Sequence, residues 1–171
     1  SALKKTLIIH AVGDAAVSQV IRVLGRVHRS HGYLPETRIE HCQFITGADA
    51  RKAKSLGVIL SMQPNFSNES LFYSDRLPPE WRLANNPFRM LIDDAGFVPG
   101  NDLLLGSDGM PAGAKEALQS SLFPPFPSQR IDLDEFIAAY CMPDQRQGWI
   151  EVDIDESRNE VQIDHVYTIL P

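Results

Sequence analysis

The chain opens on a pattern typical of a strand, a turn and a helix. An apolar run covers residues 6–11, and apolar side chains then recur at helical spacing over residues 17–27. Asp14 stands where its carboxylate can cap the start of this helix, and Gly32 stands where a helix end favours a left-handed residue. We therefore expect a strand followed closely by a helix.

The same alternation repeats further along the chain. Apolar runs predict strands at residues 38–44, 58–62 and 102–106, and helical spacing predicts helices at residues 48–56 and 87–94. Strands that alternate with helices favour a parallel sheet with right-handed crossovers. Four such units make half of an eight-stranded barrel. The predicted fold class is therefore α/β, a partial (half) TIM-type β/α barrel.

Residues 64–86 interrupt the alternation. Their prolines, asparagines and tryptophan give no regular period, so we expect a long irregular loop, and long loops in compact domains tend to be functional. The aromatic side chains of this stretch either wall an apolar pocket or pack onto the barrel. They are Phe66, Phe72, Tyr73 and Trp81.

The pattern changes again after residue 118. A proline-rich linker at 123–127 precedes a helix predicted at 133–141, and alternating apolar residues predict a β-hairpin over 149–170. We expect two domains, residues 1–120 with the half-barrel and residues 121–171 with the linker, helix and hairpin.

Composition narrows the class of protein. Of 171 residues, 43% are hydrophobic and 22% charged, as in globular domains, and the net charge of −6 disfavours nucleic acid and anionic membranes as partners. No apolar run is long enough to cross a bilayer. The two cysteines fit neither a disulfide framework nor a zinc finger and favour a reducing, cytoplasmic location. The absence of an initiator Met suggests an excised or processed chain, so a periplasmic or secreted location stays open.

Three residues with metal-binding side chains follow predicted strands. His10, His41 and Asp108 each lie at or just past the carboxyl end of a strand, where α/β barrels build their active sites. Imidazole and carboxylate groups suit zinc and similar divalent ions. On position alone, each histidine also fits a structural role, bonded to a neighbouring loop.

Four sequence blocks carry a family resemblance. In order, they resemble the strand-5 to strand-8 signatures of the amidohydrolase superfamily, closest to amidohydrolase family 3, the YtcJ-like proteins, some of which are described as exoenzyme regulatory proteins. Any one block is a weak signal, but four in order over residues 6–111 are specific. The blocks are His10-Ala-Val-Gly-Asp-Ala-Ala16, Arg38-Ile-Glu-His-Cys-Gln43, Ser61-Met-Gln-Pro-Asn65 and Gly106-Ser-Asp-Gly-Met-Pro111.

The resemblance assigns roles to the three candidate residues. It implies that His10 and His41 are metal ligands, and that Asp108 contacts the metal and transfers a proton from the attacking water to the leaving group. A divalent metal, with zinc expected, acidifies water and polarises a carbonyl, and a nearby carboxylate serves as general base. The implied reaction is hydrolysis of a C–N bond in a small-molecule amide or formamide.

The chain departs from the family in what it lacks. The strand-1 His-x-His pair and the strand-4 bridging ligand are not among these residues, so we expect weak metal binding and little or no hydrolysis from the isolated chain. The expected partners are the missing N-terminal half of the barrel or, because half a barrel leaves unpaired strand edges, further copies of the chain in a homo-oligomer.

Other residues keep two interpretations. Arg38 and Glu40 either orient His41 or form a buried ion pair that holds the barrel together. Gln63 and Asn65 either bind substrate or fix their loop. The remaining histidines are interpreted as structural, and they are His28, His31 and His165.

Two hypotheses of function follow. The first is a fragment of a metal-dependent amidohydrolase. The alternative is a non-catalytic regulatory or interaction module derived from a hydrolase half-barrel. A phosphate-binding α/β domain is disfavoured, because no Gly-rich strand-to-helix loop is present.

Overall fold

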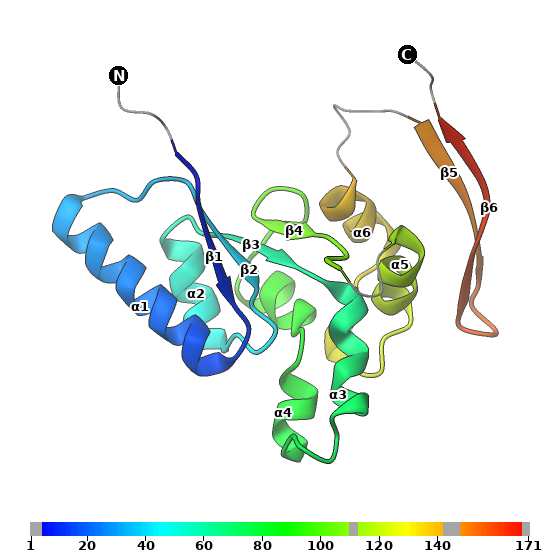
Figure 1. Cartoon of the computed structure of the whole chain (residues 1–171), viewed down its shortest axis with the longest axis horizontal. Coiled ribbons are helices and arrows are strands. Elements are labelled where there is room, and N and C mark those ends of the chain that lie inside the picture. Colours follow the sequence, from blue (N-terminus) through cyan, green and yellow to red (C-terminus); the bar gives the residue numbers. More distant parts are fainter. Residues whose placement is uncertain (1–4, 110–112, 142–147, 169–171) are drawn as a thin grey trace.

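A four-stranded parallel sheet forms the centre of the molecule (Figure 1). The computed structural model describes residues 5–109, 113–141 and 148–168. The strands lie in chain order, which confirms the predicted parallel α/β arrangement. They are β1 (Leu7–Ala11), β2 (Thr37–His41), β3 (Ile59–Met62) and β4 (Leu103–Leu105).

The second strand is shorter than predicted. It ends at His41 rather than at Phe44, because the backbone turns left-handed at His41 (φ 73°) and Cys42 (φ 51°). An extended strand requires negative φ, and hydrophobicity alone gives no sign of this turn.

The first two helices follow the predicted alternation, with α1 at Asp14–His31 and α2 at Gly47–Ser55. The prediction that Asp14 caps α1 is wrong. Gly13 is the N-cap and no side chain caps it, so Asp14 lies inside the first turn, where its charge meets the positive end of the helix dipole. Gly32 ends α1 in the left-handed conformation (φ 74°), as expected.

Residues 64–86 are largely helical, so the expectation of an irregular loop is wrong for most of them. Three short helices occur here: the 3-10 helix η1 (Pro64–Asn68), α3 (Glu69–Phe72) and α4 (Pro79–Ala84). Each is too short to display a hydrophobic period or to be stable alone. Proline occupies the first turn of η1 and of α4, where its missing N–H costs nothing.

Further helical segments follow among the described residues. The helix predicted from Pro87 is present mainly as a π-helical turn, η2 (Met90–Asp94). The sequence did not predict α5 (Ala114–Leu122), while α6 (Leu133–Tyr140) matches its prediction and begins with a capping box between Asp132 and Glu135. A 3-10 turn, η3 (Pro127–Gln129), lies between α5 and α6.

The predicted C-terminal hairpin is present as β5 (Gly148–Asp155) and β6 (Glu160–Thr168), which pair antiparallel. Its predicted end at Leu170 lies outside the described residues. Gln119 of α5 holds the hairpin through two hydrogen bonds of 2.7 Å, accepting from the Val161 N–H and donating to the Asn159 carbonyl. The division of the chain into two domains stays a prediction.

The two faces of the parallel sheet differ in burial. On one face Ile39, Leu60 and Leu103 are 0–1% exposed and belong to the same core as residues of α1 and α2. On the other face Ile8 is 55% exposed, and the strand residues whose side chains share that face are exposed or half-buried. Parallel sheets are normally covered on both faces, so this one-sided covering is consistent with part of a β/α barrel.

Candidate functional site

The two histidines predicted as metal ligands lie side by side. His10 is the last residue but one of β1 and His41 ends β2, and their ring centroids are 4.4 Å apart in an edge-to-face arrangement. Side chains along a strand alternate between the two faces of the sheet. By register, His10 shares a face with its partner Glu40, whereas His41 would share the opposite face with its partner, the buried Ala11. The left-handed backbone at His41 breaks that alternation. Such backbone outliers tend to cluster at functional sites.

His41 has two further neighbours just after β3, one at the start of η1 and one within it. Its Nδ1 atom lies 2.8 Å from Oε1 of Gln63, within hydrogen-bond distance, and its ring stacks on Phe66 at a centroid distance of 6.4 Å. Gln63 itself is only 4% exposed. Residues at the start of η1 therefore hold the His41 ring, while His10 is the more exposed histidine of the pair.

Asp108 lies after β4 in a left-handed conformation (φ 53°), with an exposed side chain. The neighbouring carbonyl of Ser107 accepts a hydrogen bond of 2.8 Å from Asn65 Nδ2, which ties η1 to this loop. Met110 and Pro111, the end of the fourth sequence block, lie outside the described residues. A common metal site for His10, His41 and Asp108 stays a prediction.

Arg38 and Glu40 form an ion pair on β2, where the Arg38 guanidinium donates to Oε1 of Glu40. The pair lies within a single strand and its side chains are 36% and 21% exposed. The pair is therefore partly exposed rather than buried, as the interpretation of a buried ion pair that holds the barrel together would require. Whether it orients His41 stays a prediction.

A buried amide network supports the carboxyl ends of β2 and β3, and sequence reasoning missed it. Gln43 donates to Glu69 and Asn85, while Asn85 and Gln129 donate to backbone carbonyls, including those of Phe66 and Ser67. Asn85 and Gln129 are fully buried. Buried amides must find partners, so this network fixes η1 and the segment that follows it.

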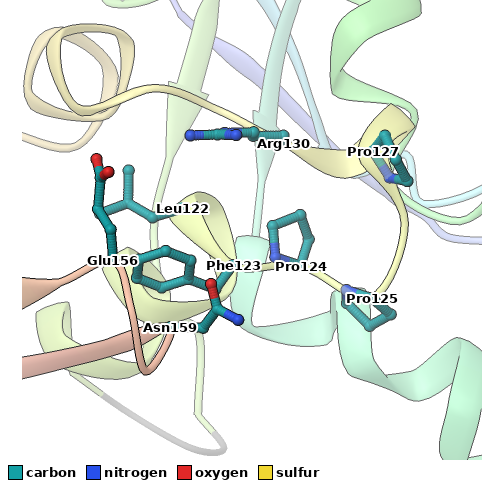
Figure 2. Close-up of a pocket in the computed structure, with 8 residues that line it drawn as sticks. All are labelled: Leu122, Phe123, Pro124, Pro125, Pro127, Arg130, Glu156 and Asn159. Atoms are coloured by element: carbon teal, nitrogen blue, oxygen red, sulfur yellow. The ribbon is translucent and has the colours of Figure 1, made fainter.

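The surface of the described structure has a groove beside β1 and a cavity beside the hairpin turn. A groove of about 500 Å³ runs between β1 and α1, includes His10 and is otherwise mostly apolar, with Leu7, Ile9 and Val20 among its walls. A second cavity has a volume of about 460 Å³, and neither His10 nor His41 lines it (Figure 2). Pro124 and Pro125 form one side of it, and Glu156 and Asn159 from the hairpin turn form the other.

The donor chemistry of the histidine pair fits part of a divalent metal site. Neutral imidazoles are common zinc ligands, and a ligating histidine usually has its second ring nitrogen hydrogen-bonded, as His41 has to Gln63. Across the part of the chain that the structure describes, no three His, Cys, Asp or Glu side chains are grouped closely enough to hold an ion. The pair alone is thus an incomplete ligand set.

Comparisons with known proteins identify the family of the chain. The model of a family described as "Amidohydrolase family" matches residues 4–113, a range that includes His10, His41 and Asp108. No curated protein matches the chain significantly.

Two solved structures share the fold. An uncharacterized metal-dependent hydrolase from Pyrococcus furiosus superposes with a TM-score of 0.62 at 20% identity, over 78% of this chain and 27% of that chain. One from Pyrococcus horikoshii OT3 gives a TM-score of 0.50 at 24% identity, over 67% of this chain and 22% of that chain. This chain therefore spans roughly a quarter of the length of the hydrolases it resembles.

Within residues 5–109, 113–141 and 148–168, no helix is both long enough and apolar enough to span a membrane. Cys42 is buried and Cys141 exposed, and both are free thiols.

Proposed function

This chain belongs to the amidohydrolase family, and from that premise we propose that it is the C-terminal part of a metal-dependent hydrolase that cleaves non-peptide C–N bonds. The observation that carries the proposal is the contact between His10 and His41 at the carboxyl edge of a parallel sheet, with Gln63 bonded to the second histidine. The metal-dependent hydrolases that share the fold support it. The proposed substrates are small amides or formamides.

Each candidate residue has a distinct proposed role. His10 and His41, with Asp108 as a third contact, would hold a divalent ion, with zinc proposed because imidazole suits it. When bound, that ion would supply the acidification of water and the polarisation of the substrate carbonyl. Asp108 would accept the proton of the attacking water and deliver it to the departing nitrogen, as a general base and then a general acid. Its exposed position after β4 leaves the carboxylate accessible for this role.

The missing ligands would come from the N-terminal half of the barrel. β1 is an edge strand of the sheet, and the apolar groove between β1 and α1 adjoins it. A preceding β/α unit would add a strand to this edge and cover Leu7 and Val23, which are 41% and 47% exposed. Homo-oligomerisation through the same edge is the other proposed arrangement.

Two finer assignments belong to the same proposal. The resemblance of the four sequence blocks favours the YtcJ-like branch of the family. The free thiols of Cys42 and Cys141 fit a reducing compartment such as the cytoplasm.

A non-catalytic role is the second candidate function. The described residues complete no group of three metal ligands, so the chain would then be a regulatory or interaction module with a hydrolase-like sheet. The upstream sequence separates the two functions, because an upstream His-x-His pair favours the enzyme.

The proposal is tested on the complete protein with a panel of N-acyl and N-formyl amines. We expect hydrolysis that a chelator abolishes and added metal restores. Asp108→Asn should lower kcat by about 100-fold or more, the usual contribution of a general base. Asp164→Asn, an exposed carboxylate of the hairpin, is the matched control. Hydrolysis that survives metal removal, or an Asp108→Asn variant with normal kcat, would refute the mechanism.

A further inference from the structure

The contact between His41 and Gln63 carries information about where the histidine proton lies. Nδ1 of His41 is 2.8 Å from Oε1 of Gln63. An amide oxygen only accepts hydrogen bonds, so the bond exists only if Nδ1 carries a proton. A neutral imidazole then has a bare lone pair on Nε2.

The orientation of the Gln63 amide follows from its other neighbour. Its Nε2 atom lies 3.4 Å from the Ser61 carbonyl oxygen. That oxygen accepts only, so turning the amide over would place two acceptors against each other. The Gln63 oxygen therefore faces His41, and the Ser61 carbonyl sets this orientation independently of the His41 tautomer.

A buried asparagine ties the Gln63 backbone to the segment that follows His41. Asn86 donates through Nδ2 to the Gln63 carbonyl at 2.9 Å and through its own N–H to the Gln43 carbonyl at 2.7 Å. Gln43 is two residues after His41, so Asn86 bridges the carboxyl ends of β2 and β3. It is fully buried and left-handed (φ 46°), a conformation that asparagine tolerates better than most residues.

We propose that Gln63 is a positioning residue that keeps the His41 proton on Nδ1 and so leaves Nε2 free to bind a divalent metal ion. This role rests on the proposed function of the histidine pair and deepens it. A histidine side chain free in water prefers the opposite tautomer, with the proton on Nε2. Gln63 therefore removes a rearrangement that metal binding would otherwise require.

The test is nitrogen NMR of the metal-free chain labelled at its histidines, at alkaline pH where imidazoles are neutral. The shifts of the two ring nitrogens distinguish the tautomers, and His41→Gln identifies the His41 signals among the five histidines. We expect the proton on Nδ1 in the wild type. Gln63→Met, of similar volume but without an acceptor, should move it largely to Nε2, and Gln63→Glu, which keeps an acceptor, should restore Nδ1.

A wild-type His41 protonated on Nε2 would overturn the proposal, and this result needs no variant to fold. An unchanged tautomer in a folded Gln63→Met chain would overturn it as well. In the complete protein, Gln63→Met should weaken metal binding by about 10- to 100-fold, as loss of a bond to a metal-ligating histidine does, and Gln63→Glu by less. Because the tautomer is measured without metal, its result is separate from that of the hydrolase proposal. A correct tautomer with no metal bound by the complete protein would refute the proposed function.

Discussion

Gly100 should be the position where a single added methyl group most severely destabilises the fold. It lies in the turn before β4, where its N–H donates to the Leu103 carbonyl and its φ is +82°. A Cβ added there would lie 2.4 Å from the carbonyl oxygen of Ala138 in α6. That oxygen belongs to the backbone, so the clash is relieved only if the turn or α6 moves.

Gly96 provides a matched control that separates the cost of the clash from the cost of the left-handed backbone. Its φ of +75° is nearly the same, but a Cβ added there meets nothing within 4 Å. Both Gly→Ala changes should therefore incur the left-handed penalty of about 1–2 kcal/mol. Gly100→Ala should add an overpacking cost of about 1–3 kcal/mol, so we expect a loss of about 2–5 kcal/mol against about 1–2 kcal/mol for Gly96→Ala.

Urea unfolding of the two variants, followed by circular dichroism and tryptophan fluorescence, measures this difference. The midpoint should fall further for Gly100→Ala than for Gly96→Ala. Equal losses for the two variants would refute the close packing of α6 on the turn before β4, and with it the attachment of the C-terminal segment to the sheet.

Three further predictions concern single side chains. Burial, and secondly the Glu40 carboxylate, raise the pKa of the Cys42 thiol far above its usual range. The folded chain then keeps a proton that the unfolded chain loses above about pH 8.5, so the unfolding free energy should fall with rising pH by up to about 1.4 kcal/mol per unit. Urea melts at about pH 7.5 and about pH 10 should show a smaller fall for Cys42→Ala, and an equal fall would contradict this. Asp132→Ala removes the cap that accepts from the Glu135 N–H and should cost about 1 kcal/mol in the same assay, whereas no loss would disprove the capping box. Glu40→Gln should cost less than about 1 kcal/mol because its ion pair with Arg38 is partly exposed, while a loss of about 3–5 kcal/mol would indicate a buried structural pair.

The sequence predicts the parallel sheet well, because its strands are apolar runs with one buried face. Ile39, Leu60 and Leu103 are apolar and buried, and each belongs to a strand that was expected. The helix α5 escaped prediction, because its buried face includes Ser120 and Ser121. Polar residues on a buried helix face weaken the hydrophobic period on which such predictions depend.

The site is predicted less completely than the sheet. Chain order places His10 and His41 at strand ends, but only the left-handed turn at His41 brings their rings together. Asn85 and Asn86 are polar and were assigned to a loop, yet both are fully buried. They are stable there because they hydrogen-bond to the backbone of distant segments. Pairings of this kind depend on tertiary contacts, which no local pattern encodes.

Metal binding by the complete protein tests the central claim most directly. Metal content and affinity should be measured for the wild type, for His10→Gln and His41→Gln, and for His28→Gln, an exposed histidine of α1, as the control. We predict that each of the first two substitutions weakens binding by more than about 100-fold, beyond the effect of losing a supporting hydrogen bond, and that His28→Gln changes nothing. Wild-type affinity in the His10→Gln or His41→Gln protein would contradict the account.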